Sequence, residues 1–96
     1  MTGILYEWDD EKDALNRQKH GIAFEDAAHV FEDANYLEMY DFEHSTDEDR
    51  YIAIGKVEDI LFVVFTERRE RIRLISARIA NAAERRLYYD SYLYSK

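Results

Sequence analysis

The most regular pattern of apolar and polar positions in the chain covers residues 71–78. Ile72 and Leu74 alternate there with Arg71 and Arg73. Successive side chains of a strand point to opposite sides, so this run predicts a strand with one apolar and one basic face. We expect it to be the last strand of a sheet.

The preceding apolar runs predict the rest of the sheet. One run is apolar at nearly every position and predicts a central strand that is covered by helices. Two further apolar runs are bounded by polar residues or turns and also predict strands. The predicted strands are 36–40, 50–57 and the central 60–67, with turns at 58–59 and 67–70. Together with the last strand they form a largely antiparallel sheet of four strands.

Three helices are predicted from the 3.6-residue period and from capping residues. The first covers residues 10–20, after an N-cap in Trp8-Asp9-Asp10 and before Gly21, which favours the left-handed conformation that closes a helix. The second has a buried stripe formed by Phe24, Ala27, Ala28 and Phe31. The third covers residues 82–94, with Asn81 and Glu84 as a capping box and a partly buried face of Leu87, Tyr88, Tyr92 and Leu93.

The order of two helices, four strands and one helix predicts an α+β fold. The 96 residues suit a single domain, 1–96, and 47% hydrophobic residues suffice for one core. The chain has no cysteine, no signal-like start, and no apolar run long enough to span a membrane. We therefore expect a soluble cytoplasmic protein.

The net charge of -8 is unevenly distributed. Residues 1–49 contain 15 acidic and 3 basic residues, whereas residues 50–96 contain 6 acidic and 10 basic residues. This asymmetry indicates either an anion-attracting surface on one side of the protein or ordinary solvated faces. Five arginines are concentrated near the last strand and helix: Arg71, Arg73, Arg78, Arg85 and Arg86.

Several short motifs, in this order and spacing, resemble the BrnT family, and the resemblance extends from about residue 7 to residue 89. The motifs are Glu7-Trp8-Asp9 with Lys12, Asn16 and Lys19-His20-Gly21; Phe24-Glu25-Asp26-Ala27 with Val30-Phe31; His44-Ser45 with Glu48 and Arg50; and Ile75-Ser76-Ala77-Arg78 with Glu84-Arg85 and Tyr88. The chain departs from the family pattern at Ala23, Ala34 and the Glu58-Asp59 turn, which are helix-cap and loop positions.

The resemblance implies a RelE-like fold and the role of an endoribonuclease toxin in a type II toxin-antitoxin system. Such a toxin cleaves RNA and thereby inhibits translation. The implied partner is a BrnA-like antitoxin with a ribbon-helix-helix DNA-binding domain, so that DNA would be reached only through the antitoxin. The alternative, from a different functional class, is a non-catalytic protein-interaction module of similar fold.

Candidate site residues follow from the chemistry of RNA cleavage, which needs a base, an acid and positive charge beside the phosphate. The predicted catalytic residues are His20, Glu48, Arg50, Arg73 and Arg78. The predicted RNA-binding residues are Lys19, Arg71, Arg85 and Tyr88. We predict no cofactor and no metal, because no His, Asp and Glu grouping has a metal-ligand spacing.

Each candidate also has a structural alternative. His20 either titrates near neutral pH in catalysis or serves only as a C-capping cation. Glu48 and Arg50 either act on RNA or form a surface ion pair. Arg71 and Arg73 either hold phosphates or form a solvated strand face. The last-helix tyrosines either stack on bases or belong to the core and its rim.

Overall fold

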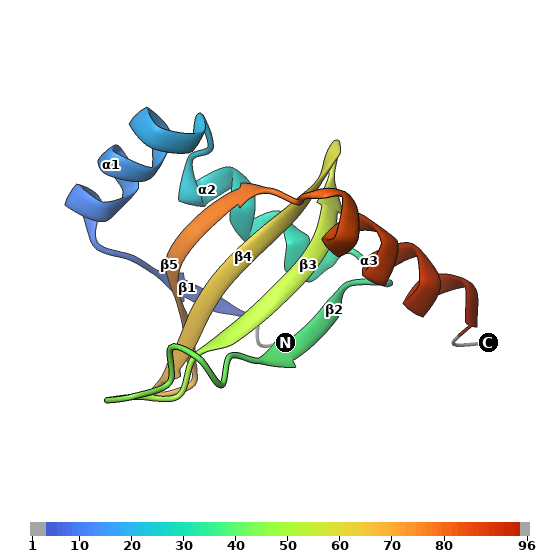
Figure 1. Ribbon diagram of the computed structural model, residues 1–96. Helices are drawn as coiled ribbons and strands as arrows, with labels where there is room; N and C mark the ends of the chain where they lie inside the picture. Colours follow the sequence, from blue (N-terminus) through green and yellow to red (C-terminus); the bar gives the residue numbers. More distant parts are fainter. Residues whose placement is uncertain (1–3, 95–96) are drawn as a thin grey trace.

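A computed structural model describes residues 4–94, without the side chains of Tyr92 and Tyr94. Figure 1 shows the arrangement of its elements. In chain order they are β1 (Leu5–Glu7), α1 (Asp10–His20), α2 (Phe24–Ala27), the 3-10 helix η1 (Ala28–Glu32), β2 (Leu37–Tyr40), β3 (Tyr51–Val57), β4 (Asp59–Arg68), β5 (Arg71–Ile79) and α3 (Ala82–Tyr94). Among residues 4–94, no helix has the length and apolar character needed to cross a membrane.

The sheet has five strands in the order β1-β5-β4-β3-β2, not the predicted four. The predicted central strand is indeed in the middle, and the meander from β2 to β5 is antiparallel as expected. The fifth strand, β1, pairs in parallel with the start of β5, so the sheet is mixed. Three residues are too few to produce a detectable alternation, and their partners lie 66 positions away in the chain.

The two tight turns of the meander, between β3 and β4 and between β4 and β5, contain residues with positive φ. Arg69 and Glu70 have φ values of 50° and 67°, as expected for the two central residues of a tight hairpin turn. Glu58 has a φ of 64°, a conformation that glycine adopts more readily than glutamate. The Glu58-Asp59 departure from the family pattern therefore falls at a position where glycine would be favourable.

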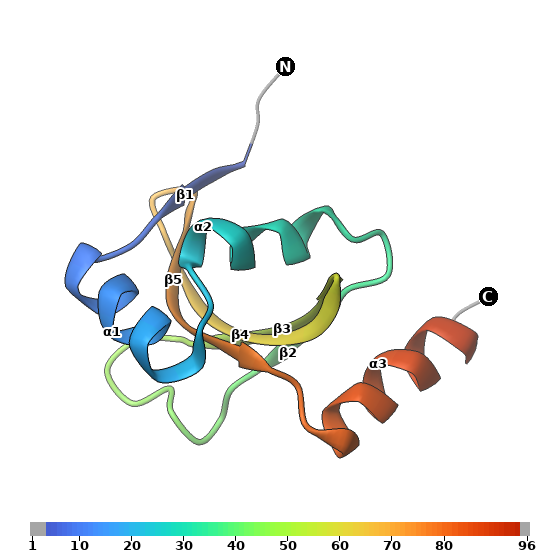
Figure 2. The same ribbon diagram turned by 90° about the horizontal axis from the view of Figure 1, so that it is seen from above.

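Helices α2 and α3 lie on opposite faces of the curved sheet. Figure 2 shows the sheet curving around α2 and η1, with α3 beyond its outer side. Under α2 and η1 lies the larger core cluster, which contains Phe24, Ala27, Ala28, Val30, Ala53, Leu61, Val63, Phe65, Leu74 and Ala77. Under α3 lies a smaller cluster formed by Ile54, Ile60, Ala80 and Tyr88.

The helix boundaries agree with the predictions in most details. Asp9 caps α1 by accepting the amides of Glu11 and Lys12, and Gly21 ends it with a φ of 73°. The predicted second helix is shorter than expected, because α2 passes into η1 after one turn. Ala23 provides no side-chain cap; the Asp13 carboxylate accepts the Phe24 amide at 2.8 Å in its place.

The face predicted for the last helix was largely wrong. Tyr88 is buried, but Leu87 and Leu93 are 48% and 61% exposed. Tyr92 lies outside the side chains that the structure describes. Of the three residues of this face whose side chains the structure describes, Tyr88 alone is buried.

Asn16 extends the edge of the sheet where β1 ends. Its side-chain nitrogen donates to the carbonyls of Ile22 and Ala77, both at 2.9 Å, and its oxygen accepts the Ala77 amide at 3.1 Å. The side chain thereby satisfies both backbone groups of Ala77, as a neighbouring strand would. Asn16, one of the residues of the family motifs, is thus buried and has a structural role.

We expect Asn16→Leu to lower the free energy of unfolding by about 2 kcal/mol, because it leaves buried backbone groups of β5 without partners. Urea unfolding monitored by circular dichroism measures this loss. Gln18→Leu, at an exposed position of the same helix, is the matched control and should change stability little. Equal midpoints for the two variants would contradict this role of Asn16.

Candidate functional site

The sheet face opposite α2 carries a row of arginines. Strand register pairs Arg71 with Arg68, Arg73 with Thr66, and Arg78 with Phe62. Arg50 directly precedes β3, whose register brings it beside Thr66. Along each strand these side chains alternate with the core residues of the α2 side, and a register shift between Val64 and Phe65 keeps Arg78 on the same outer face as Arg73, although five positions separate them. We call this surface the arginine face, defined by Arg50, Arg68, Arg71, Arg73 and Arg78.

The first strand places a carboxylate among these arginines. Glu7 accepts a hydrogen bond from the Arg73 guanidinium at 3.0 Å, and its other oxygen lies 3.8 Å from Arg71. The Arg73 side chain remains 28% exposed. Glu7 and Arg71 line a cavity of about 610 Å³ together with Arg68 at the end of β4 and Arg69 in the turn that follows. Sequence analysis missed Glu7 because it missed β1.

The loop between β2 and β3 determines the position of Arg50. The Ser45 hydroxyl donates to the Asp41 carbonyl at 2.6 Å and accepts the Arg50 amide at 2.8 Å. The Asp41 amide in turn donates to the Arg50 carbonyl at 2.8 Å. Asp41 is buried, and its carboxylate lies 3.0 Å from the His44 ring. The backbone at Arg50 is therefore firmly anchored.

Glu48 does not form the ion pair with Arg50 that was considered from the sequence. Its carboxylate instead accepts from Arg68 at 3.0 Å. The Nε atom of Arg50 is buried and has no hydrogen-bond partner among the described residues. Glu48 thus lies on the same face as Arg50, with Arg68 as its ionic partner.

The guanidinium group of Arg78 contacts both a carboxylate and an aromatic ring. It makes two hydrogen bonds of 2.8 Å to Glu84, and its charged carbon lies 4.1 Å from the centre of the Phe62 ring. The same Glu84 forms the predicted capping box, since it accepts the Asn81 amide while its own amide donates to the Asn81 side chain. Arg78 therefore links the arginine face to the start of α3.

The pKa values of this pair are shifted in opposite directions. The hydrogen bonds from Arg78 lower the pKa of the Glu84 carboxyl, although partial burial acts against them. The same hydrogen bonds raise the pKa of Arg78. A carboxyl whose pKa is lower in the folded than in the unfolded chain stabilises the fold above its unfolded value, and this stabilisation disappears as pH falls through the folded value.

We expect Glu84→Gln to lower the thermal midpoint at neutral pH, and the difference from the parent protein to shrink below pH 4.5, the ordinary value for this carboxyl. Thermal unfolding followed by circular dichroism over a series of pH values tests this. Glu67→Gln, at an exposed carboxylate, should show no such dependence. A constant difference for Glu84→Gln at all pH values would rule out the pair as its origin.

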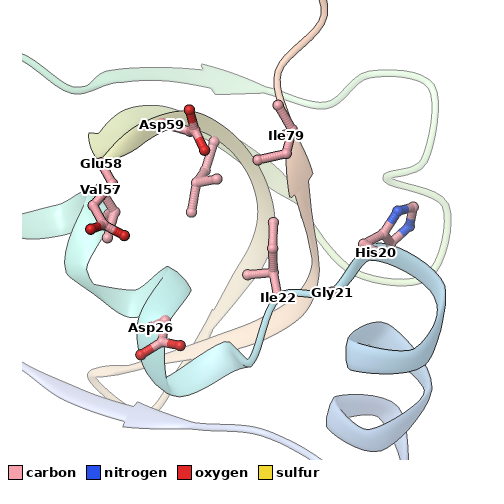
Figure 3. A pocket seen from close by; sticks show the side chains of 9 residues that line it. His20, Gly21, Ile22, Asp26, Val57, Glu58, Asp59 and Ile79 are labelled. Atoms are coloured by element: carbon pink, nitrogen blue, oxygen red, sulfur yellow. The ribbon is translucent and has the colours of Figure 1, made fainter.

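His20 and Lys19 lie at the α1 edge of this face. With Lys12, Leu15, Ile75 and Ser76 they line a groove of about 190 Å³ beside β5. His20 also lines a cavity of about 410 Å³ on its other side, shown in Figure 3. In that view Asp26 and Glu58 lie on the side of the cavity opposite to His20. His20 is the last residue of α1, directly before Gly21, so its C-capping position also agrees with the structural alternative.

Tyr88 and Arg85 occupy contrasting places on α3. Tyr88 is 4% exposed, and its hydroxyl donates to the Asp33 carboxylate at 2.6 Å. In this conformation its ring cannot stack on RNA, and it fixes α3 to the body of the protein instead. Burial alone would raise the pKa of Asp33, but the hydrogen bonds from Tyr88 and from the Asn35 and Lys56 amides lower it. Arg85 is exposed.

The predicted residues therefore form two groups rather than one compact site. Glu48, Arg50 and Arg73 gather near the ends of β3 and β4, whereas His20 and Lys19 lie along the α1 groove. Arg73 and Arg78 are five positions apart on β5, which corresponds to roughly 15 Å along a strand. Among residues 4–94, no three His, Cys, Asp or Glu side chains are arranged to hold a metal ion.

Comparison with known proteins identifies the family of this chain. The family model for the ribonuclease toxin BrnT of type II toxin-antitoxin systems matches residues 8–84. The chain belongs to the BrnT family. The crystal structure of the Brucella abortus ribonuclease toxin BrnT is similar, with 26% sequence identity and a TM-score of 0.64 over 82% of this chain and 99% of that one. A sequence search of curated proteins gave no match.

Family membership confirms the resemblance seen in the motifs, and the structural similarity extends to the α+β architecture. As a member of the BrnT family, this chain is a ribonuclease toxin of a type II toxin-antitoxin system. A toxin of this type has an antitoxin as its partner. The match begins directly after β1 and covers the whole of β3, β4 and β5, so the arginines of the arginine face all fall within it.

Proposed function

We propose that the chain is a metal-independent endoribonuclease that cleaves RNA at the arginine face and thereby inhibits translation. The observation that supports this proposal most strongly is the presence of Arg50, Arg73 and Arg78 on one sheet face of a BrnT-family protein. Arginine is permanently charged and presents a planar set of donors that suits phosphate oxygens. The proposal includes a RelE-like fold, which the resemblance of the motifs to the BrnT family implies.

The proposed reaction is attack of the ribose 2'-oxygen on the adjacent phosphorus. A base removes the 2'-hydroxyl proton, the bond from phosphorus to the 5'-oxygen breaks, and an acid donates a proton to the leaving oxygen. The products carry a 2',3'-cyclic phosphate and a 5'-hydroxyl. Arg50 and Arg73 would stabilise the charge that develops on the phosphorane oxygens.

The proton transfers have two candidate groups. Glu48 lies with Arg50 on the arginine face and is the proposed base. His20 lies at the α1 groove with Lys19 and is the second candidate, since a histidine can titrate near neutral pH. Lys19, Arg71 and Arg85 would bind the phosphates of the flanking nucleotides.

We expect purified protein to cleave RNA in the presence of EDTA and to leave 2',3'-cyclic phosphate ends. Gel analysis of labelled RNA, before and after treatment with a phosphatase that removes terminal but not cyclic phosphates, distinguishes these ends. Abolition of cleavage by EDTA, with recovery on addition of Mg²⁺, would contradict metal independence. A protein that bound RNA or protein without cleaving any RNA would support the alternative of an interaction module.

The proposed partner is a BrnA-like antitoxin with a ribbon-helix-helix domain, which binds across the arginine face and excludes RNA. Charge complementarity would chiefly accelerate this association. Reversal of Arg71 and Arg73 to glutamate should therefore slow association and reduce its dependence on salt. In cells, expression of the chain alone should arrest growth, and co-expression of an antitoxin encoded beside it should relieve the arrest.

A further inference from the structure

One end of the sheet, on its α2 side, carries aromatic rings together with carboxylates. Tyr40 is 36% and Phe42 86% exposed. The Tyr40 ring contacts the rings of Phe42 and Tyr51 at centroid distances of 4.6 and 5.6 Å, and Tyr51 stacks on buried Phe65 at 5.6 Å. The rings are therefore anchored in the core although the outermost is almost fully exposed. We call this the acidic aromatic surface, defined by Tyr36, Tyr40, Phe42, Tyr51, Glu38, Asp49 and Glu67.

Two of its carboxylates hold the tyrosine hydroxyls in place. Tyr36 donates to Glu38 at 3.1 Å, and Tyr40 donates to Asp49 at 2.8 Å. Partial burial raises the pKa of Tyr51, and the negative charges of Asp49 and Glu67 raise it further. Partial burial and the Glu38 carboxylate raise the pKa of Tyr36 in the same way. Tyr36 and Tyr51 thus lie in a negative electrostatic field.

The carboxylates of this surface lack the arginine partners found on the other face of the sheet. Glu7, Glu48 and Glu84 each pair with an arginine of the arginine face. Within residues 4–94, by contrast, no lysine or arginine forms an ion pair with Glu38, Asp49 or Glu67. The negative charge here is therefore available to a molecule from outside.

We propose that the acidic aromatic surface binds a protein segment in which arginine or lysine side chains alternate with apolar ones. Cations are attracted to the faces of aromatic rings, and charge-assisted hydrogen bonds to the carboxylates would orient them. Phe42 and Tyr40 offer exposed apolar area of the kind that is enriched in protein interfaces. RNA is not a suitable occupant, because its phosphates would meet three carboxylates.

This surface lies on the opposite side of the sheet from the arginine face. A segment bound to it leaves Arg50, Arg73 and Arg78 uncovered. The inference therefore does not depend on the proposed cleavage reaction or on where the antitoxin binds.

The test uses a fluorescein-labelled decapeptide of alternating arginine and leucine, with a peptide of alternating glutamate and leucine as the negative probe. Fluorescence anisotropy at several salt concentrations measures binding to the full-length protein. We expect the arginine peptide to bind and the glutamate peptide not to bind. Equal binding of both peptides, or no binding of the arginine peptide, would overturn the proposal.

Matched variants test whether the peptide binds at this surface. Phe42→Ser should weaken binding about fivefold, as expected for one exposed cation-aromatic contact, whereas Leu87→Ser on α3 should not. Both side chains are exposed, so both variants should remain folded. If Leu87→Ser weakens binding as much as Phe42→Ser, the assignment to this surface is wrong.

A charge-matched pair separates a local contact from general attraction to an acidic protein. Glu38→Gln with Glu67→Gln should weaken binding and reduce its salt dependence, whereas Asp10→Asn with Glu11→Gln on α1 changes the net charge equally and should have little effect. Equal effects would attribute binding to net charge alone. Self-association that Phe42→Ser abolishes in sedimentation experiments would identify a second copy as the occupant and overturn the proposal of a cationic partner.

Discussion

Arg73→Ala should lower the rate of RNA cleavage about a hundredfold while the protein stays folded. Arg73 lies in the middle of the arginine face, near Arg50, and its guanidinium is partly exposed. Stabilisation of charge that develops in the transition state affects the rate more than substrate binding. Single-turnover cleavage of a labelled RNA, with enzyme in excess, measures this rate.

The natural control is Arg86→Ala, which removes the same charge from the exposed side of α3. It should leave cleavage nearly unchanged, and alanine is favourable in a helix. Arg73→Lys keeps the charge but loses the planar pair of donors, so its rate should fall between the parent and Arg73→Ala. Full activity of Arg73→Ala would remove Arg73 from the catalytic set.

Arg78 needs a different experiment because it has a structural role as well. Arg78→Ala removes both hydrogen bonds to Glu84 and the contact with the Phe62 ring. Its effect on the rate should therefore be compared with that of Glu84→Gln, which disturbs the same pair but keeps the arginine. A rate loss in Arg78→Ala that Glu84→Gln does not share would belong to the arginine itself.

The sequence predicted the elements whose determinants lie close together in the chain. Caps at Asp9 and Gly21, the Asn81 and Glu84 capping box, and the apolar run of β4 all act within a few residues, and all were placed correctly. Periodicity also distinguished the apolar face of β5 from its basic face. Local propensity and burial agree at these positions, which is why single-sequence reasoning succeeds there.

What the sequence did not reveal depends on pairs far apart in the chain. The partners of Glu7 lie more than 60 positions away, and so does the Ala77 backbone that Asn16 satisfies. The contact between Tyr88 and Asp33 spans 55 positions. Polar residues with such partners look like surface residues in a one-dimensional pattern. The ionic partners of the arginine face could therefore not be predicted before the pairing of the strands was known.

The assembled fold also changes the interpretation of the candidate site. Spacing alone suggested one group of arginines, but Arg73 pairs with Glu7 from β1 and Arg78 pairs with Glu84 from α3. Arg68, Arg71, Arg73 and Arg78 thus each have a nearby carboxylate, which reduces the repulsion among the arginines of this face. RNA phosphates would compete with these carboxylates for the same donors.

Phe65→Ala should lower the free energy of unfolding by about 3 to 5 kcal/mol, the range for truncating a buried phenylalanine. Phe65 lies on the central strand, is 1% exposed, and contacts the Phe31 ring edge-on at 5.0 Å. The backbone around it is paired on both sides by β3 and β5, so the space left by the ring cannot close easily. A loss of this size corresponds to a fall of roughly 15 °C or more in the thermal midpoint of a domain of this size.

Phe42→Ala is the matched control for this prediction, because it removes the same ring from a position that is 86% exposed. Surface substitutions usually change stability by less than about 0.5 kcal/mol, so the two variants should differ several-fold in their effect. Urea unfolding followed by circular dichroism gives both values under the same conditions. Phe65→Leu, which keeps part of the apolar volume, should fall between them. If Phe65→Ala and Phe42→Ala unfold at the same midpoint, the central position of β4 in the core is wrong, and with it the register that brings Arg73 and Arg78 to the outer face.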